Sequence, residues 1–182
     1  MIRIAQILLR CLLILWVAPV SAQLLMTQEE ALRSAFPDSA SVIRQTLFLT
    51  DAQVSTIQNQ ARAQVESKLV IYYRAVQAGK TTGYAFFETT TIRTKPATIM
   101  VVVSPDSSLR LLQILAFYEP HDYLPAPRWL TLFQNKFLND ELWPKRSIHQ
   151  ITGATLSVQA LTLAARRLLA TFIVAVPKES KS

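Results

Sequence analysis

The hydrophobic positions of the chain follow two different periods, helical near both ends and β-like in the middle. Thr27 and Glu30 form a capping box, with Thr at the N-cap and Glu at the third helical position, which begins a short helix. The same device recurs at Thr50, and the apolar positions after it return at near-helical spacing, which predicts an amphipathic helix over residues 51–64. The residues between the two helices, 42–49, are predicted to form a strand.

Four runs of β-branched, aromatic or aliphatic residues follow, separated by short turn sequences. They span residues 69–73, 82–89, 98–103 and 109–118. Residues 78–80 supply a turn between the first two runs, which predicts a hairpin. Residues 104–107 supply another turn between the last two. Because short turns connect antiparallel neighbours, the middle of the chain is predicted to be an antiparallel sheet.

Two further helices are predicted after this sheet. Pro127 stands near the first position of one of them, which carries Trp129 and Phe133 on one side. The other begins near Ser157 and keeps apolar residues at helical spacing as far as Phe172. The expected fold class is therefore α+β, a central antiparallel sheet with flanking helices.

The first 22 residues are typical of a secretory signal peptide. Arg3 and Arg10 precede an apolar stretch that ends in a small-x-small pattern at Ala22, so we expect cleavage between Ala22 and Gln23. The alternative is an uncleaved membrane anchor, but Arg10 interrupts the run of about 20 apolar residues that a span requires. Cleavage also removes Cys11, and a cysteine-free exported chain is compatible with a bacterial periplasm.

Composition narrows the function classes further. In 182 residues, hydrophobic residues make up 51% and there is one Cys, which allows an apolar core but excludes a zinc ribbon or a disulfide scaffold. Without Arg3 and Arg10, 17 basic residues face 12 acidic ones, a net charge of +5. No run of Lys or Arg is dense enough to indicate nucleic-acid binding.

The candidate chemistry lies in residues 151–157, at the entry to the last helix. Backbone N–H groups at such an entry lack intrahelical partners, and the helix dipole favours an anion there. Gly153 and Ala154 would let a phosphate and its ribityl chain approach the backbone, and Thr155 presents a hydroxyl as nucleophile or ligand. The alternative is an ordinary helix N-cap by Thr152 or Thr155, with Ser157 either a second hydroxyl near a phosphate or a first-turn cap.

Two arginines in the same helix are expected to do something else. Arg166 and Arg167 follow Thr155 by about 16 Å of helix, too far for a phosphate bound at Thr155. We expect both to face solvent or a partner protein. Their charge also argues against a membrane span in this helix.

Three segments form an ordered series through the second half of the chain. Residues 117–119 read Phe-Tyr-Glu, residues 127–136 read Pro-Arg-Trp-Leu-Thr-Leu-Phe-Gln-Asn-Lys, and residues 152–155 read Thr-Gly-Ala-Thr. In these segments the chain resembles the FMN-binding domain family, which has Tyr-x-Glu, Pro-Arg-Trp-x-x-x-Phe-x-Gly-Lys and Asp-x-x-(Ser/Thr)-Gly-Ala-Thr in this order. That family occurs in peripheral subunits of the Rnf and sodium-pumping NADH:quinone reductase complexes and in nitrous oxide respiration flavoproteins.

The resemblance extends from about residue 69 to residue 169, and two positions depart from it. Asn135 replaces a glycine, and asparagine also tolerates a left-handed backbone. His149 replaces the aspartate of the motif that the flavin transferase reads. The expected organisation is a signal peptide at 1–22, an extension at 23–67, the FMN-binding domain at 68–176 and a tail at 177–182.

The resemblance implies that an FAD-dependent flavin transferase attaches FMN to Thr155 through a phosphoester bond. The protein would then carry electrons between redox partners, for example within a membrane electron-transport complex. The implied cofactor contacts are Thr155, Ala154, Gly153, Thr152, Ser157, Glu119, Lys136 and Trp129.

Two other functions remain open at this point. One is a periplasmic binding or accessory module that keeps the fold but carries no covalent flavin, because His149 removes the transferase signal. The other is an enzyme that uses noncovalent FMN to reduce a small substrate. The residues show no catalytic triad and no pair of acidic residues spaced for hydrolysis, so an independent hydrolase is not expected.

Overall fold

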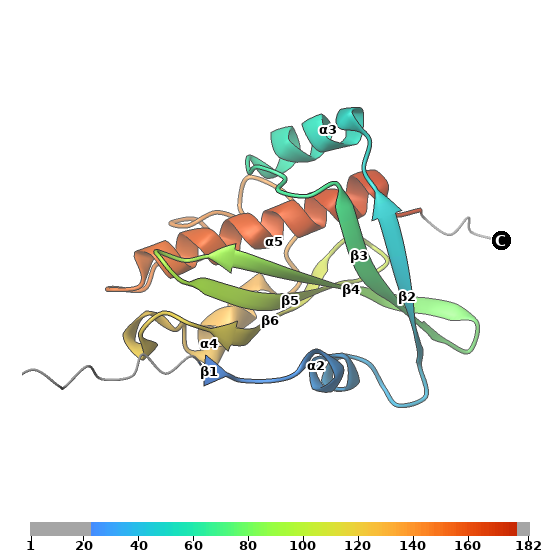
Figure 1. Ribbon diagram of the computed structural model, residues 1–182, viewed down its shortest axis with the longest axis horizontal. Coiled ribbons are helices and arrows are strands. Elements are labelled where there is room, and N and C mark those ends of the chain that lie inside the picture. Colours follow the sequence, from blue (N-terminus) through green and yellow to red (C-terminus); the bar gives the residue numbers. More distant parts are fainter. Residues whose placement is uncertain (1–22, 178–182) are drawn as a thin grey trace, which may run out of the picture.

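Six strands form one antiparallel sheet in the computed structural model, which describes residues 23–177 (Figure 1). The strands are β1 (Gln23–Leu24), β2 (Ser41–Phe48), β3 (Leu69–Gln77), β4 (Lys80–Thr91), β5 (Pro96–Val103) and β6 (Leu109–Phe117). Their order across the sheet is β1-β6-β5-β4-β3-β2, and all neighbours are antiparallel. The predicted α+β class with a central antiparallel sheet is confirmed. The predicted signal peptide and most of the predicted tail lie outside the described residues.

The helices also begin close to where the sequence places them. They are α2 (Gln28–Ala35), α3 (Asp51–Ala61), α4 (Pro127–Leu130) and α5 (Thr155–Ala175), with short 3-10 turns η1 (His121–Tyr123) and η2 (Thr131–Phe133). Thr27 and Thr50 both form the expected capping boxes, in which side chain and backbone bond reciprocally. Helix α5 begins two residues earlier than predicted, at Thr155, the second threonine of the candidate motif.

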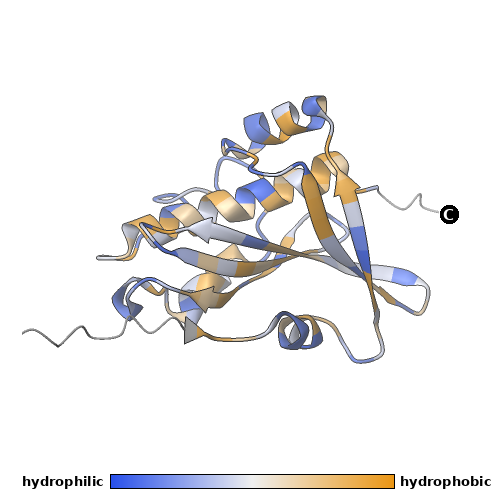
Figure 2. Ribbon diagram, viewed as in Figure 1, coloured by the Kyte–Doolittle hydropathy of each residue, from blue (hydrophilic) through white to orange (hydrophobic). Residues whose placement is uncertain are grey.

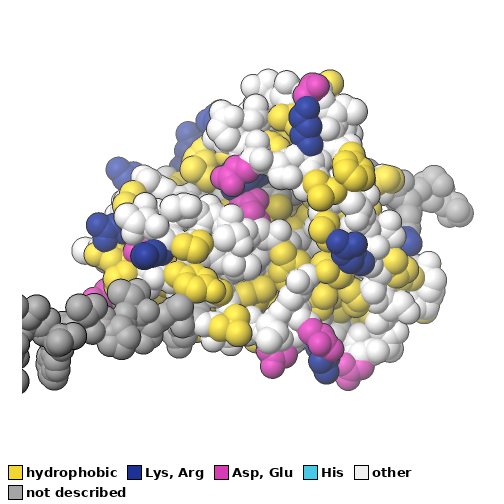
Figure 3. Space-filling model, in the orientation of Figure 1, with side chains coloured by type: hydrophobic (Ala, Val, Ile, Leu, Met, Phe, Trp, Pro, Cys, Tyr) yellow, Lys and Arg dark blue, Asp and Glu magenta, His cyan; other side chains and the backbone are white. Residues whose placement is uncertain are grey.

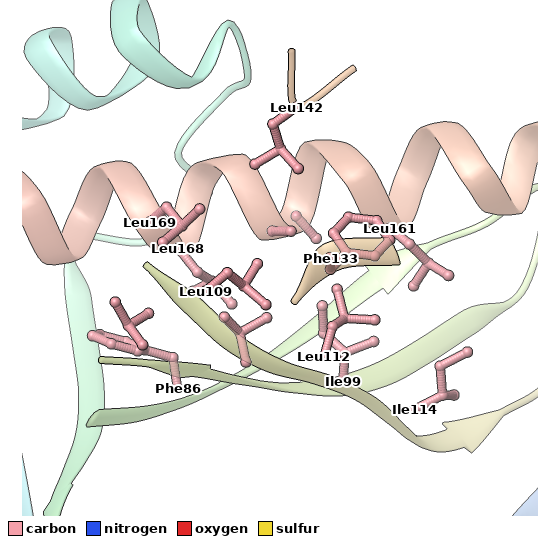
Figure 4. Close-up of a cluster of buried hydrophobic side chains, with 14 of the residues drawn as sticks. Phe86, Ile99, Leu109, Leu112, Ile114, Phe133, Leu142, Leu161, Leu168 and Leu169 are labelled. Atoms are coloured by element: carbon pink, nitrogen blue, oxygen red, sulfur yellow. The ribbon is translucent and has the colours of Figure 1, made fainter. Parts of the chain in front are cut away.

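Helix α5 lies across one face of the sheet and packs its apolar side chains into the core on that side (Figure 4). Leu161, Leu168 and Leu169 point from the helix toward Leu112 and Ile99 on the strands. By length and composition alone α5 would suffice to cross a membrane, but 61% of its most apolar window is buried inside this protein. Its hydrophobicity is accounted for by the core.

The remaining helices cover less of the sheet. Helix α2 packs on the opposite face through Ala31, and the Phe36 ring just beyond α2 packs there too, against Met100 and Val102. Helix α3 packs against α5 through Ile57 and Ala61, around Ala170. Figure 2 shows hydrophobic positions along α5, whereas α2 and α3 each carry a hydrophilic side. The larger core thus lies under α5 on one face of the sheet, and a smaller one lies under α2 on the other.

The segment before residue 68, which the resemblance leaves uncovered, belongs to the same sheet. β1 pairs with β6, and β2 pairs with β3 along its whole length. Asn135, which stands at the family's glycine, has a φ of 60°, so the expectation that this turn keeps a left-handed backbone is confirmed.

Candidate functional site

The site begins at the first residue of α5. Thr155 occupies that position and its side chain is exposed. The N-cap residue, Ala154, provides no side-chain hydrogen bond, in contrast to the caps of α2 and α3. The first helical bond runs from Val158 N–H to the Ala154 carbonyl over 3.1 Å. The N–H groups of the preceding turn therefore have no intrahelical acceptor, and this end of the helix is suited to an anion.

The backbone before Thr155 turns sharply. Ala154 N–H donates to the Ile151 carbonyl over 3.0 Å, and Gly153 has a φ of 84°. A Cβ added at Gly153 would meet nothing within 4 Å, so the backbone angle, not crowding, requires glycine here. The Ala154 methyl is buried. The turn leaves the Thr155 hydroxyl on the outer surface.

A pocket of about 280 Å³ opens beside Thr155. Residues 153–157 form one wall, and Arg93 and Tyr123 form the other. Arg93 comes from the turn between β4 and β5, and its guanidinium carbon lies 4.6 Å from the centroid of the Tyr123 ring. A cation thus stands at the rim of a pocket that also contains the free N–H end of a helix. The pocket combines two features that stabilise a phosphate.

Arg93 and Tyr123 were missed by the sequence analysis. Two strands, β5 and β6, lie between Arg93 and Thr155 in the sequence, and no motif singles Arg93 out. The sequence pointed to Arg93 only indirectly, because the resemblance marked Glu119, which holds the turn that carries Arg93.

Glu119 does not line the pocket but supports it from behind. Its Oε1 accepts the backbone N–H groups of Arg93 (3.2 Å), Thr94 (2.6 Å) and Lys95 (2.8 Å). These bonds, the one from Thr94 first, lower the pKa of the Glu119 carboxyl below its usual range. The side chain is 6% exposed. Glu119 therefore fixes the turn that carries Arg93.

Ser157 and Trp129 also hold the site in place. The Ser157 hydroxyl is buried and donates to the Tyr123 carbonyl over 2.6 Å, which ties η1 to the first turn of α5. The Trp129 indole donates to the His149 carbonyl over 2.7 Å, and its ring packs edge-on against Phe133. Both residues were predicted as cofactor contacts, and both are engaged within the protein. The Ser157 bond joins two segments that line the pocket, and the Trp129 bond fixes the loop that leads into α5.

Besides Glu119 and Trp129, two more predicted contacts, Thr152 and Lys136, do not line this pocket. Thr152 is exposed and does not cap α5, so the alternative of an N-cap by Thr152 is wrong. Lys136 pairs through its backbone with Leu109, at the start of β6, whereas the pocket lies beyond the end of that strand. The structure brings together Thr155, Ala154, Gly153 and Ser157 with Arg93, and leaves Lys136 apart.

The expectation for the two arginines of α5 was wrong. Arg166 is 2% exposed and donates to four carbonyls, those of Gln60, Ala61, Asn139 and Leu142. Arg167 forms a bidentate ion pair with Glu88 on β4. Arg166 lies inside the fold because α3 and the loop before α5 fold over it. Arg167 is held by Glu88 on β4 and by the Gln64 carbonyl after α3.

Comparisons of the chain with protein-family models, with curated proteins and with solved structures found no match. Among residues 23–177 there is also no group of three or more His, Cys, Asp or Glu side chains that would hold a metal ion.

Proposed function

We propose that the protein is an exported electron-transfer flavoprotein that carries FMN on Thr155 through a phosphoester bond. The observation that supports the proposal is the exposed Thr155 hydroxyl at the uncapped N-terminus of α5, in a pocket rimmed by Arg93. A threonine that merely capped the helix would be satisfied by the backbone, whereas no side-chain cap bond forms here.

The residues at this site fit a phosphodiester. The free N–H groups of the first turn of α5 would face its oxygens, and Arg93 would offer a guanidinium for its negative charge. The left-handed backbone at Gly153 turns the chain just before these N–H groups, and Gly153 itself lines the pocket. The Glu119 carboxylate accepts hydrogen bonds from the turn that carries Arg93 and does not line the pocket.

Bound FMN would supply one- and two-electron transfer, and the protein's part is to hold and orient it. Trp129 and Ser157 contribute by fixing the loop before α5 and the first turn of α5. Thr155 itself is the acceptor in a transfer catalysed by another protein, an FAD-dependent flavin transferase. In that transfer the Thr155 oxygen would bond to the phosphorus of the FMN half of FAD, the pyrophosphate P–O bond to the AMP half would break so that AMP leaves, and the hydroxyl proton would pass to solvent.

The test is the intact mass of the exported chain after co-expression with a flavin transferase. We expect the mass of FMN less one water to be added, and the adduct to disappear in Thr155→Val, which keeps the side-chain shape but removes the oxygen. Thr56→Val is the matched control, because Thr56 is exposed on α3, lies outside the motif and does not line the pocket, and this change is expected to leave the adduct intact. A wild-type chain that stays unmodified while a control substrate is modified would contradict the proposal.

The second candidate is a periplasmic binding or accessory module without covalent flavin, and His149 is the residue that favours it. Its backbone carbonyl is held by Trp129, so the side chain at 149 is displayed from a fixed loop where the family has aspartate. Flavin attachment to His149→Asp but not to the wild type would favour this second function for the natural chain.

A further inference from the structure

Strand β2 leaves one of its two sides unpaired. It forms the edge of the sheet beyond β3, and no strand within residues 23–177 pairs with its outer side (Figure 1). Leu49 N–H donates to the Lys68 carbonyl over 2.8 Å, which shows which residues of the strand direct their backbone groups toward β3. Because bonding residues alternate along an antiparallel strand, the residues of β2 that bond to β3 are Ser41, Ile43, Gln45 and Leu47. The N–H and C=O groups that point outward are those of Val42, Arg44, Thr46 and Phe48.

The side chains along this edge are unusually apolar for an exposed strand. Phe48 is 77% exposed and Leu69, its partner on β3, is 47% exposed. Val42 and Ile43 are also exposed. Figure 3 shows hydrophobic side chains gathered over this part of the sheet. A long strand with free backbone groups and apolar side chains is a template for pairing with another strand.

We propose that β2 pairs with β2 of a second copy of this chain, antiparallel and centred on Gln45. A two-fold axis perpendicular to the sheet keeps the same face of both strands on the same side. An even-numbered residue then stands opposite an even-numbered one, and an odd-numbered residue opposite an odd-numbered one. Centring on Arg44 would place two guanidinium groups side by side, which is unfavourable. Centring on Gln45 places Arg44 opposite Thr46, Val42 opposite Phe48 and Ile43 opposite Leu47. This register separates the only charges of β2 and pairs all of its apolar residues.

The pairing would satisfy the outward groups of four residues on each strand, about eight interchain hydrogen bonds. It would join two six-stranded sheets into one, with α5 of both copies on the same side. The pocket at Thr155 lies near the turns at the ends of β4 and β6, and the dimer leaves it open. The proposal does not depend on flavin attachment.

The register makes a sharp test possible with single cysteines. In a Cys11→Ser background no other thiol is present. Gln45 would face its own copy in a non-hydrogen-bonded pair, where Cα atoms are about 4.5 Å apart and a disulfide can form. We expect Gln45→Cys to cross-link under mild oxidation at least tenfold faster than Arg44→Cys or than Ser55→Cys, an exposed position on α3. Faster cross-linking of Arg44→Cys would overturn the register.

Light scattering and a proline variant test the dimer itself. The exported chain is expected to have twice the mass of one copy. Thr46→Pro removes only an outward N–H group, so it should give a monomer with an unchanged circular dichroism spectrum. A wild-type monomer at every concentration, or a folded Thr46→Pro dimer, would overturn the proposal. If Thr46→Pro does not fold, the cysteine series decides, and absence of a fast Gln45→Cys cross-link would overturn the proposal.

Discussion

At the scale of single residues, the candidate site depends on side chains that never touch Thr155. Glu119 belongs to a segment that the resemblance marked for cofactor binding, yet its carboxylate accepts three backbone N–H groups of the β4–β5 turn. Arg93, which no pattern marked, is the residue that reaches the pocket. A motif in the sequence reports that a residue matters at the site, but the contact through which it acts depends on a turn formed far away in the chain.

Replacing Glu119 should therefore destabilise the fold as well as the pocket. Three hydrogen bonds to a charged acceptor are lost in Glu119→Ala, and we expect about 3 kcal/mol less free energy of unfolding. Glu119→Gln keeps an oxygen in the same place and should recover more than half of this loss. Urea denaturation of the two variants beside the wild type is the measurement. Equal losses in both variants would contradict a role as hydrogen-bond acceptor.

The same carboxylate gives a pH dependence of known sign. The hydrogen bonds hold the pKa of Glu119 below its ordinary value of 4.5, so the folded state binds this proton less readily than the unfolded chain. The stability of the wild type over Glu119→Gln should thus be complete at neutral pH, and should be lost as the pH falls below about 4.5 toward the folded pKa. Denaturation at a series of pH values measures the difference. A difference that persists in acid would contradict the assignment.

At the scale of elements, most strands and helices of this chain could be predicted from the sequence, but the contacts between distant elements could not. Both capping boxes, the hairpin of β3 and β4, and the proline at the start of α4 each rely on neighbours within a few residues, and all occur as expected. The two-residue β1 was not predicted, because its pairing with β6 bridges most of the chain. The helical spacing of α5 likewise could not reveal what would cover Arg166.

Arg166 joins three elements, and its loss should loosen one of them in particular. It supplies donors to the last carbonyls of α3 and to the loop at residues 139–142, which have no intrahelical or ladder partners. We expect Arg166→Met to lower the free energy of unfolding by at least about 3 kcal/mol. Amide exchange should rise first in α3. Arg166→Lys should rescue little, because an ammonium does not span both sets of carbonyls. Unchanged exchange in α3 would contradict this role.

The ion pair between Glu88 and Arg167 invites a double-mutant cycle. Both side chains are largely buried between β4 and α5, so removing one leaves a charge without its partner. Glu88→Leu and Arg167→Leu should each cost about 3 kcal/mol, and the double variant should cost less than either alone. Burial raises the pKa of Glu88 although Arg167 opposes the shift, so the pair is not expected to stabilise the fold strongly. Additive losses in the cycle would contradict this account.

At the scale of the whole molecule, the sheet determines which parts of the chain depend on each other. The resemblance divides the chain near residue 68, but β2 pairs with β3 across that boundary and α3 packs on α5 beyond it. β1 closes the far side of the same sheet. Sequence similarity shows where a family pattern applies, whereas the hydrogen-bonded sheet shows which residues must fold together. Here the resemblance begins near residue 68, but the folding unit begins at β1.

This difference predicts how the chain unfolds. Because residues 23–67 provide both outer strands and the helix that Arg166 holds, the chain should unfold in one cooperative transition, with tryptophan fluorescence and circular dichroism changing together. A chain that begins at residue 68 would expose the apolar residues of β3 and the buried guanidinium of Arg166, and we expect it not to reach the folded state. Two separate transitions in the full chain, or a folded shortened chain that accepts flavin on Thr155, would instead show that residues 23–67 are an independent addition to the domain.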